Sequence, residues 1–295
     1  MTHDVVVLGG TGVDSTVYVP ALPLPYADTY AVPPVLDRIG NTGSGVALGC
    51  HALGLRVLIA DLVGDDPQGR LVREHFAARD IEAAWATAPQ GTRRSVLLVG
   101  PDGRRTSLFD VRDAPGERLP RELYLDAVRT ARHVHVSIND FCRHVYPDLA
   151  DRPAATISTD LHDWDGENGH HWDFALSSGL VFLSATALGD RREEVMRTIL
   201  GAGRAETVVC TAGADGCHVL DAEGLRHVPA VTPPGPVVDS NGAGDAFVSG
   251  FLYGRLHGRP ATECARLGAI AGAHACTVPG THEDPITAAA LLARA

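Results

Sequence analysis

Short apolar runs alternate along the chain with longer segments in which apolar residues recur at helical spacing. Uninterrupted runs of this length are typical of buried parallel strands, and they occur at Val5–Leu8, Arg56–Ala60, His133–Ser137, Ala155–Thr159, Gly179–Leu183 and Thr207–Thr211. Helical spacing is found at Val46–Leu53, Gln68–Arg79, Arg121–Arg129, Glu193–Leu200, Ala243–His257 and Ala261–His274. This alternation predicts an α/β protein in which helices cover both faces of a mostly parallel sheet.

Two regions break this alternation. Residues 14–38 contain five prolines among alternating apolar positions, and residues 82–112 contain short apolar stretches joined by turns, including the turn at Pro101–Gly103. Both are typical of β-hairpins outside a main sheet. With no internal repeat and no linker, the chain is expected to form one domain, 1–295. A small β-sheet lid, built from roughly 14–38 and 82–112, is expected to be inserted in it.

Composition narrows the class of protein. Of 295 residues, 45% are apolar and 21% charged, and no run approaches the roughly 20 apolar residues of a membrane span. The first residues lack the basic and long apolar segments of a signal peptide. The six cysteines form no CxxC pair, which is typical of free thiols in a reducing compartment. We therefore expect a soluble, cytoplasmic protein without a membrane partner.

Charge restricts the chemistry further. A net charge of −11 argues against a nucleic-acid partner, which requires basic patches. All 25 basic residues counted as lysine or arginine are arginines. The absence of lysine excludes the P-loop, the protein-kinase strand lysine and Schiff-base catalysis. Any phosphate chemistry must therefore use backbone amides, arginine or a metal ion.

Two motifs are better explained by structure than by ligand binding. The glycines of Gly9–Ser15 follow a strand, but the prolines after them forbid the helix that a dinucleotide fingerprint needs. We expect a strand end that leads into the lid, with Asp14 at the carboxyl edge of the sheet. The histidines His162, His170 and His171 lack zinc-site spacing and are expected in a polar loop.

The segment VVDSNGAGDAFVSGF (237–251) combines a strand end, a glycine-rich turn and an apolar helical pattern. The first amides of a helix are unpaired and carry partial positive charge. If a helix begins near Ala243, the amides of Gly242, Ala243 and Gly244 can form an anion hole for a phosphoryl group. Asp245 would lie beside it, placed to take a proton from an attacking hydroxyl. The simpler alternative is an acid that caps an ordinary turn.

The sequence DSNGAGD closely resembles the DTxGAGD signature of the PfkB/ribokinase family of sugar and nucleoside kinases. Three further segments resemble landmarks of that family in the same order along nearly the whole chain: Ile39–Leu55, Leu62–Gly69 and Thr211–Gly216. The resemblance implies a ribokinase-like three-layer α/β/α sandwich with a mostly parallel central sheet and a small β-sheet lid.

The resemblance also implies roles for residues. Asp245 would be the catalytic base, with the anion hole formed by Gly242, Ala243 and Gly244. The substrate would be bound by Asp14, Gly40, Asn41, Thr42, Gly43 and Gly45. The nucleotide ATP, which brings Mg²⁺ with it, would be bound by Ser184, Thr211, Gly213, Ala214, Gly216, Ala271 and His274. Asp239 would lie near a monovalent cation such as K⁺.

The chain departs from the family pattern at two places. The substrate motif GGxxxN has Asn41 in place of its second glycine and Gly45 in place of its asparagine, so the substrate is expected to differ from ribose or to be larger. The NxxE motif, linked to magnesium and phosphate, is replaced by SATAL (184–188), and the nearest acid is Asp190.

Together these features predict an ATP-dependent phosphotransferase that acts on a hydroxyl of a sugar or sugar derivative. A nucleoside kinase is the close alternative, and a sugar- or nucleotide-binding regulator with weak catalysis is a further one. The exposed edge of a lid is a surface for pairing with a second lid, so a homodimer is expected.

Overall fold

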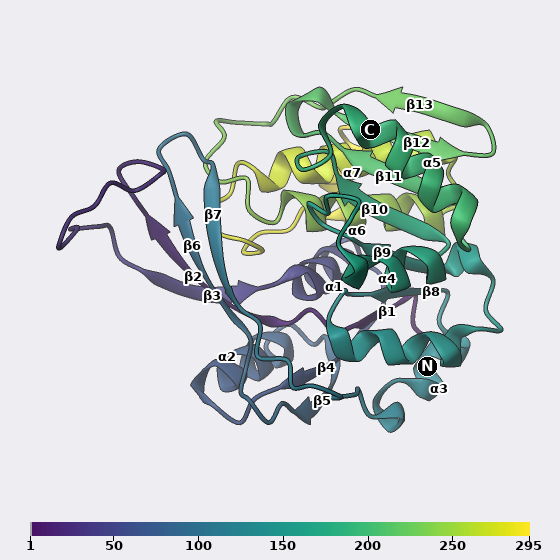
Figure 1. Cartoon of the computed structure of the whole chain (residues 1–295), viewed down its shortest axis with the longest axis horizontal. Helices are drawn as coiled ribbons and strands as arrows, with labels where there is room; N and C mark the ends of the chain where they lie inside the picture. The colour runs from purple at the N-terminus through teal and green to yellow at the C-terminus, as the bar shows by residue number, and fades with distance from the viewer. Residues whose placement is uncertain (1) are drawn as a thin grey trace.

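The computed structural model describes residues 2–295 and contains a central nine-stranded sheet in the order β13-β12-β11-β10-β9-β8-β1-β4-β5 (Figure 1). Neighbouring strands from β11 to β5 run parallel, and the β12–β13 hairpin at one edge is antiparallel. The strands are β1 (Val5–Leu8), β4 (Val57–Val63), β5 (Glu82–Thr87), β8 (His133–Val136), β9 (Ile157–Asp160), β10 (Leu180–Ser184), β11 (Thr207–Thr211), β12 (Cys217–Asp221) and β13 (Gly224–Val228).

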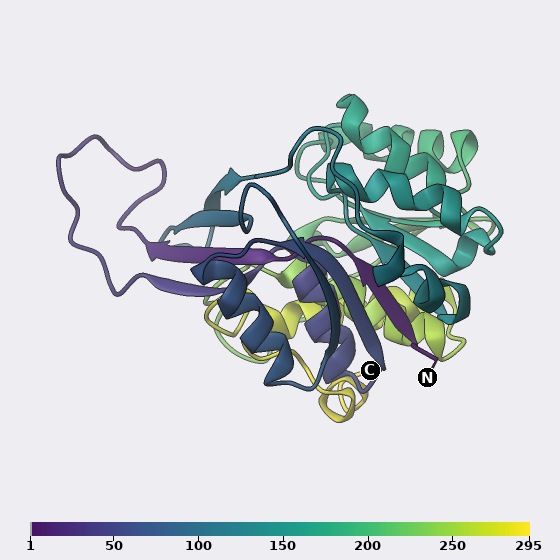
Figure 2. The ribbon, with the colours of Figure 1, turned by 90° about the horizontal axis from the view of Figure 1, so that it is seen from below.

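Helices cover both faces of this sheet, because its central strands are apolar on both sides. Figure 2 shows the two helical layers on either side of it. Val5 and Val7 of β1 belong to one core cluster, and Val6 and Leu8 belong to the other. The first cluster is covered by α1 (Thr42–Ala52), α2 (Pro67–Ala77), α6 (Ala243–Leu256), α7 (Ala261–Ala275) and α8 (Ala288–Leu292). The second is covered by α3 (Leu125–Thr130), the 3₁₀ segment Asp140–Leu149, α4 (Trp172–Ser177) and α5 (Arg192–Ala202).

A second, four-stranded sheet projects from one side of the molecule (Figure 2). Its order is β3-β2-β6-β7, with β2 (Gly12–Tyr18), β3 (Leu36–Gly40), β6 (Arg94–Val99) and β7 (Arg105–Asp110). We call it the small sheet. The three-layer fold with a mostly parallel central sheet and a small additional sheet confirms the predicted fold class.

One part of the predicted lid belongs elsewhere. Glu82–Thr87 forms β5, which pairs with β4 as the edge strand of the central sheet. Its side chains are half-buried or exposed, so its pattern is that of an edge strand and is easily mistaken for hairpin material. The small sheet consists of β2 and β3 from the first predicted segment and of β6 and β7 from the second.

Helix α1 also begins earlier than its apolar pattern indicates, at Thr42 and not at Val46. Gly43, Gly45 and Gly49 lie within it, and glycine lowers the helical signal of a sequence. Close approach explains these glycines. A Cβ on Gly43 would lie 1.9 Å from the carbonyl oxygen of Gly9, and one on Gly49 would lie 2.3 Å from Ser249 Oγ.

A helix must be long and apolar to span a membrane. Among residues 2–295, no helix is both long enough and apolar enough to cross a membrane.

Candidate active site

The turn before helix α6 places backbone amides at the edge of the central sheet. Gly242 caps the helix with a φ of 75°, in the left-handed region that favours glycine. A Cβ at this position would lie 2.0 Å from the carbonyl oxygen of Thr281, so a larger residue does not fit. The amide of Ala243 makes only a long 3.4 Å contact with Ser240, and within residues 2–295 the amides of Gly242 and Gly244 have no acceptor. Space beside Gly244 is open, so these amides are free to meet an anion.

Asp245 lies in the first turn of α6 and is only 7% exposed. Burial raises its pKa well above the usual value for a carboxyl group, and the nearby charge of Asp160 raises it further. Arg105 opposes this shift, while Asp14 adds to it. A buried carboxyl group beside free helix amides, with a raised pKa, has the properties of a general base.

Asp14 approaches the same place from strand β2 of the small sheet. It is buried, and its Oδ2 accepts a 3.1 Å hydrogen bond from the hydroxyl of Thr281. Burial raises the pKa of Asp14, opposed by hydrogen bonds from Thr281 and Ser95 and by the charge of Arg105. The structure therefore brings together two carboxyl groups, Asp14 and Asp245, that are far apart in sequence.

Arg105 is a site residue that sequence reasoning missed. It belongs to strand β7 and is exposed, yet its charge lowers the pKa of both Asp14 and Asp245. Its positive charge therefore affects both carboxyl groups. No motif marks it. The absence of lysine was the one available signal, because it leaves arginine as the only permanently charged basic side chain for a phosphate.

The predicted substrate segment Gly40–Gly45 is only partly a loop. Gly40 ends β3, Asn41 has a positive φ of 66°, and Thr42, Gly43 and Gly45 form the first turn of α1. The predicted substrate residues therefore lie on a strand end and on the first turn of a helix. The short helical turn brings the segment close to both Asp14 and Asp245: a Cβ on Gly40 would lie 2.0 Å from Asp14 Cγ, and one on Gly45 would lie 2.6 Å from Asp245 Cβ.

A second missed element is the segment between α7 and α8, which folds back over the start of α6. Thr281 contacts Asp14, as described, and also accepts a hydrogen bond from Asn241 Nδ2. His282 Nε2 lies 3.6 Å from Asp245 Oδ2. Glu283 Oε1 is paired with Arg38 Nε of the small sheet at 3.4 Å. The segment thus connects the small sheet to the helix that carries Asp245.

Asp239, the predicted cation ligand, is completely buried. Its Oδ1 accepts a 2.9 Å hydrogen bond from the amide of Asn241. Its Oδ2 has no hydrogen-bond partner within residues 2–295. A buried carboxylate oxygen without a donor is costly, and a bound monovalent cation would satisfy it. The residue present therefore fits such an ion.

The predicted nucleotide residues lie at the ends of neighbouring strands. Ser184 of β10 is paired with Thr211 of β11, and the loop after Thr211 contains Gly213 and Gly216 with positive φ values of 55° and 86°. Ala214 is exposed between them. His274 Nε2 is 3.1 Å from the carbonyl oxygen of Asp284. Ala271 packs in the hydrophobic core, and we therefore leave it out of the proposed nucleotide site.

The described side chains of this site do not form a set of ligands for Mg²⁺. Within residues 2–295, no group of three or more histidine, cysteine or acidic side chains is arranged to hold a metal ion. Asp190, the acid nearest to the SATAL segment, is exposed in a short 3₁₀ turn. Asp160, at the end of β9, is the acid whose charge most affects Asp245. The donor set does not fit a protein-held Mg²⁺.

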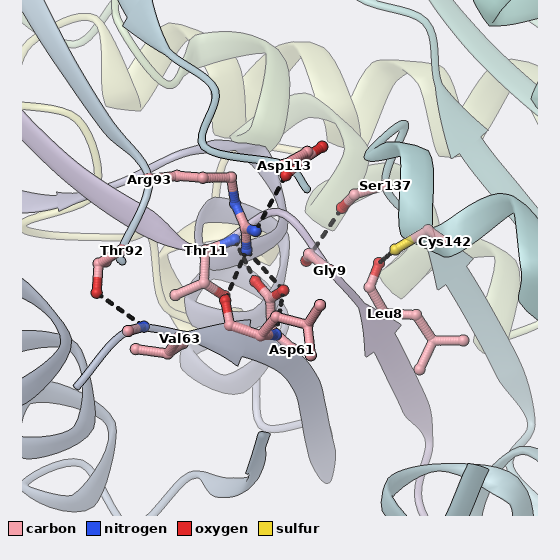
Figure 3. A network of polar contacts seen from close by, with 12 residues as sticks. Leu8, Gly9, Thr11, Asp61, Val63, Thr92, Arg93, Asp113, Ser137 and Cys142 are labelled. Carbon is pink, nitrogen blue, oxygen red and sulfur yellow. Dashed lines mark hydrogen bonds and ion pairs between the residues drawn. The ribbon is translucent and has the colours of Figure 1, made fainter. Parts of the chain in front are cut away.

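A buried ion pair attaches the small sheet to the central sheet (Figure 3). Arg93, just before β6, is 1% exposed, and its Nη2 donates to Asp61 Oδ1 of β4 at 2.6 Å. Asp61 Oδ2 accepts from the amide of Thr11 at 2.7 Å. The carbonyl oxygen of Arg93 accepts from the amide of Val13 at 3.1 Å. This network fixes the segment that leads from β1 to Asp14.

Comparison with known proteins identifies the family. Residues 179–288 match the family model described as pfkB family carbohydrate kinase. The acarbose 7(IV)-phosphotransferase of Actinoplanes sp. is 52% identical over 98% of this chain and 97% of its own length. The chain belongs to the PfkB family of carbohydrate kinases. This confirms the family predicted from DSNGAGD and the other landmarks, and it confirms that the protein is an enzyme.

Solved structures of PfkB-family and ribokinase proteins share the fold. A microbiome-derived acarbose kinase is 43% identical, with a TM-score of 0.91 over 100% of this chain and 99% of that one. Arabidopsis thaliana ribokinase, in complex with ribose and ATP, has a TM-score of 0.82 at 18% identity over 99% of this chain and 98% of its own. At that identity the second likeness concerns the fold alone. As a PfkB carbohydrate kinase, the protein phosphorylates a small-molecule sugar with ATP.

Proposed function

We propose that this kinase transfers the γ-phosphoryl group of ATP to a hydroxyl of acarbose or a closely related sugar derivative. The observation that carries the catalytic part of the proposal is the position of the buried Asp245 carboxyl group beside the free amides that begin α6. The 52% identity with an acarbose phosphotransferase supports the substrate class. The departures at Asn41 and Gly45 from the family's substrate motif support a substrate other than ribose.

In the proposed mechanism, the acceptor hydroxyl lies between the small sheet and α6. Asp14 accepts a hydrogen bond from the sugar and orients it. Asp245 removes the proton of the acceptor hydroxyl as its oxygen bonds to the γ-phosphorus, and the bond to the ADP oxygen breaks. The raised pKa of Asp245 brings its basicity closer to that required at neutral pH.

Negative charge on the transferred group is balanced without lysine. The amides of Gly242, Ala243 and Gly244 lie at the start of α6, where the helix dipole adds partial positive charge. Arg105 supplies a full positive charge from the small sheet. Phosphoryl transfer depends mainly on positioning and charge stabilisation, and these groups provide both.

For the nucleotide, we propose a site formed by Ser184, Thr211, Gly213, Ala214, Gly216 and His274, at the ends of β10 and β11 and beside α7. Glycines with positive φ allow the backbone to approach a ligand closely. Magnesium, carried by the phosphates of ATP, would neutralise their charge. We propose K⁺ or a similar ion at Asp239, whose free oxygen supports it.

A homodimer remains a proposal, and the small sheet supports it. Its strands expose apolar side chains at Leu36, Val96, Leu108 and Phe109. Exposed apolar strands of this kind are surfaces for pairing with another chain. Light scattering at working concentration tests the proposal, and a monomeric mass would contradict it.

The test of function is ADP release from ATP and Mg²⁺ with acarbose, ribose and adenosine as separate acceptors. We expect turnover with acarbose at a kcat/KM at least tenfold above that for ribose or adenosine. Asp245→Asn should lower kcat by roughly a hundredfold to ten-thousandfold, the usual share of a general base, while binding of ATP persists. Asp126→Asn, whose side chain is fully exposed on α3, is the matched control.

Two results would contradict the proposal. Preference for adenosine would assign the protein to the nucleoside kinases of the fold. Full activity of Asp245→Asn would remove Asp245 as the base, whichever sugar is phosphorylated.

A further inference from the structure

The imidazole of His282 is buried beside the proposed base and has one nitrogen without a partner. Its side chain is 5% exposed, and Nε2 lies 3.6 Å from Asp245 Oδ2. That distance is too long for a hydrogen bond, and Nε2 has no other partner within residues 2–295. A buried polar atom left unpaired destabilises the fold. The structure thus contains an unused hydrogen-bonding atom beside the carboxyl group of Asp245.

The space that His282 fills is the space that a side chain at position 45 would need. A Cβ on Gly45 would lie 2.3 Å from His282 Cε1 and 2.8 Å from its Nδ1. The family motif that Ile39–Leu55 resembles has asparagine where this chain has Gly45. The loss of a polar side chain from α1 is therefore matched by a polar ring that enters the same volume from the segment after α7.

The ring is neutral at physiological pH. Burial lowers the pKa of His282 to about 4, so the ring is neutral at pH 7. The backbone of Asn41 opposes this shift, and since Nε2 has no partner within residues 2–295, Nδ1 is the ring nitrogen on which that backbone group acts. A nitrogen that donates to a backbone carbonyl carries the proton. With the ring proton on Nδ1, Nε2 presents a lone pair and accepts a hydrogen bond.

We propose that His282 is a specificity-determining substrate residue, whose Nε2 accepts a hydrogen bond from a sugar hydroxyl next to the one that faces Asp245. This inference rests on the proposed function, and it goes beyond the family motif because that motif has no residue at this position. Two acceptors 3.6 Å apart match two O–H donors on neighbouring carbons of a sugar. An amide at position 45 would offer a donor as well as an acceptor, so the exchange selects a different pattern of hydroxyls.

The test compares His282→Leu, which removes the acceptor, with His282→Gln, which keeps an acceptor oxygen near the position of Nε2. With acarbose, we expect His282→Leu to lower kcat/KM about tenfold, mainly through KM, because a neutral hydrogen bond in a buried site contributes about that factor. KM for ATP should remain unchanged. His282→Gln should recover most of the loss. The control is His257→Leu, which removes a histidine at the C-terminal end of α6, the end far from Asp245.

A KM for acarbose within twofold of wild type in soluble, folded His282→Leu would overturn the inference. If that variant does not fold, titration of wild-type enzyme with acarbose, followed by the ¹⁵N resonance of the His282 ring, replaces it. His282→Gln serves to assign the resonance. An unchanged Nε2 resonance at saturating acarbose would equally overturn the inference. Failure of the proposed function is distinct, since wild-type enzyme would then phosphorylate no acarbose.

Discussion

The carboxyl group of Asp14 occupies the space that a side chain on Gly40 would need: a Cβ on Gly40 would lie 2.0 Å from Asp14 Cγ and 2.2 Å from Oδ1. The two residues are on the neighbouring strands β2 and β3. Replacing Gly40 with alanine must therefore displace the carboxyl group. We expect Gly40→Ala to raise KM for the sugar at least tenfold, with a smaller change in KM for ATP, measured by steady-state kinetics.

The matched control is Gly201→Ala. Gly201 lies in α5, and no atom lies within 4 Å of the position of its Cβ. Alanine in a helix is favoured over glycine by about 0.5–1 kcal/mol, so this variant should be as active as wild type and at least as stable. Equal KM values for the sugar in Gly40→Ala and wild type would contradict the role proposed for Asp14.

Asp245 is expected to reduce stability while it serves catalysis. Its pKa is raised in the folded state, so the folded protein binds its proton more tightly than the unfolded chain does. The associated stabilisation is complete below the unfolded pKa of about 3.9 and is lost as the pH rises through the folded pKa. Asp245→Asn should therefore melt at a higher temperature than wild type at pH 8, and the difference should shrink toward pH 4.

Thermal melting of both proteins across this pH range checks the expectation. Each kcal/mol of change in the free energy of unfolding shifts the melting temperature by roughly 2–4 °C in a domain of this size. The same pKa predicts that kcat/KM falls on the acid side at a higher pH than for a solvent-exposed carboxyl group. A variant that melts below wild type at pH 8 would show that the carboxylate stabilises the fold.

Local pattern was sufficient to predict much of this molecule. Val5–Leu8 and Thr207–Thr211 form strands with the predicted bounds, and α6 begins at Ala243 as its glycine turn indicated. These features depend on residues close together in sequence. The start of α1 was missed because Gly43 and Gly45 weaken the helical pattern, although close packing requires both.

Contacts between distant segments could not be predicted. The Thr281–Asp14 hydrogen bond joins residues 267 positions apart, and no periodicity or motif marks Thr281 or His282. The charge of Arg105 affects the pKa of Asp245 only through the tertiary fold. The sequence motif identified the base and its helix, whereas the residues that surround the substrate come from the tertiary arrangement.

Arg105 is expected to act on the transferred phosphoryl group. Its charge lowers the pKa of both Asp14 and Asp245, so the same charge would favour negative charge that develops beside them. We expect Arg105→Gln to lower kcat by about tenfold to a hundredfold, because one charged contact that strengthens in the transition state contributes a few kcal/mol at most. The acid limb of the pH–rate profile should also move to higher pH, since the pKa of Asp245 loses a lowering influence.

Arg104→Gln is the control for that experiment. Arg104 is adjacent in sequence, its side chain is 82% exposed, and it pairs with Asp102 at 2.6 Å. Its removal should leave kcat within twofold of wild type. Similar kinetic losses in the two variants would show a general effect of charge on the small sheet in place of a specific role for Arg105.

Asp239 is expected to confer dependence on a monovalent cation. Its Oδ2 is buried and unpartnered within residues 2–295, so an ion there would neutralise a buried charge beside the anion hole. Wild-type enzyme assayed with K⁺ should exceed the rate in a buffer of bulky organic cations several-fold. Asp239→Asn should lose that difference. Cation-independent rates in wild type would exclude the ion.

The pair of Arg93 and Asp61 is expected to govern both stability and the position of the small sheet. Their side chains are 1% and 0% exposed, and removing one partner of a buried pair typically costs 3–5 kcal/mol because the other charge is left uncompensated. Arg93→Met should therefore melt roughly 6–20 °C below wild type, at 2–4 °C for each kcal/mol. The double variant Arg93→Met/Asp61→Asn should lose less than the sum of the two single losses, because it leaves only Asp113, 3.5 Å from Arg93 in the wild type, without a partner.

Arg197→Met supplies the comparison, since Arg197 forms a surface pair with Glu193 on α5 and should lose less than about 0.5 kcal/mol. Function provides a second readout. Arg93 also bonds through its backbone to Val13, the residue before Asp14, so loosening this attachment should raise KM for the sugar more than KM for ATP. A double variant that loses the full sum, with both KM values unchanged, would show that Arg93 and Asp61 act independently and do not position Asp14.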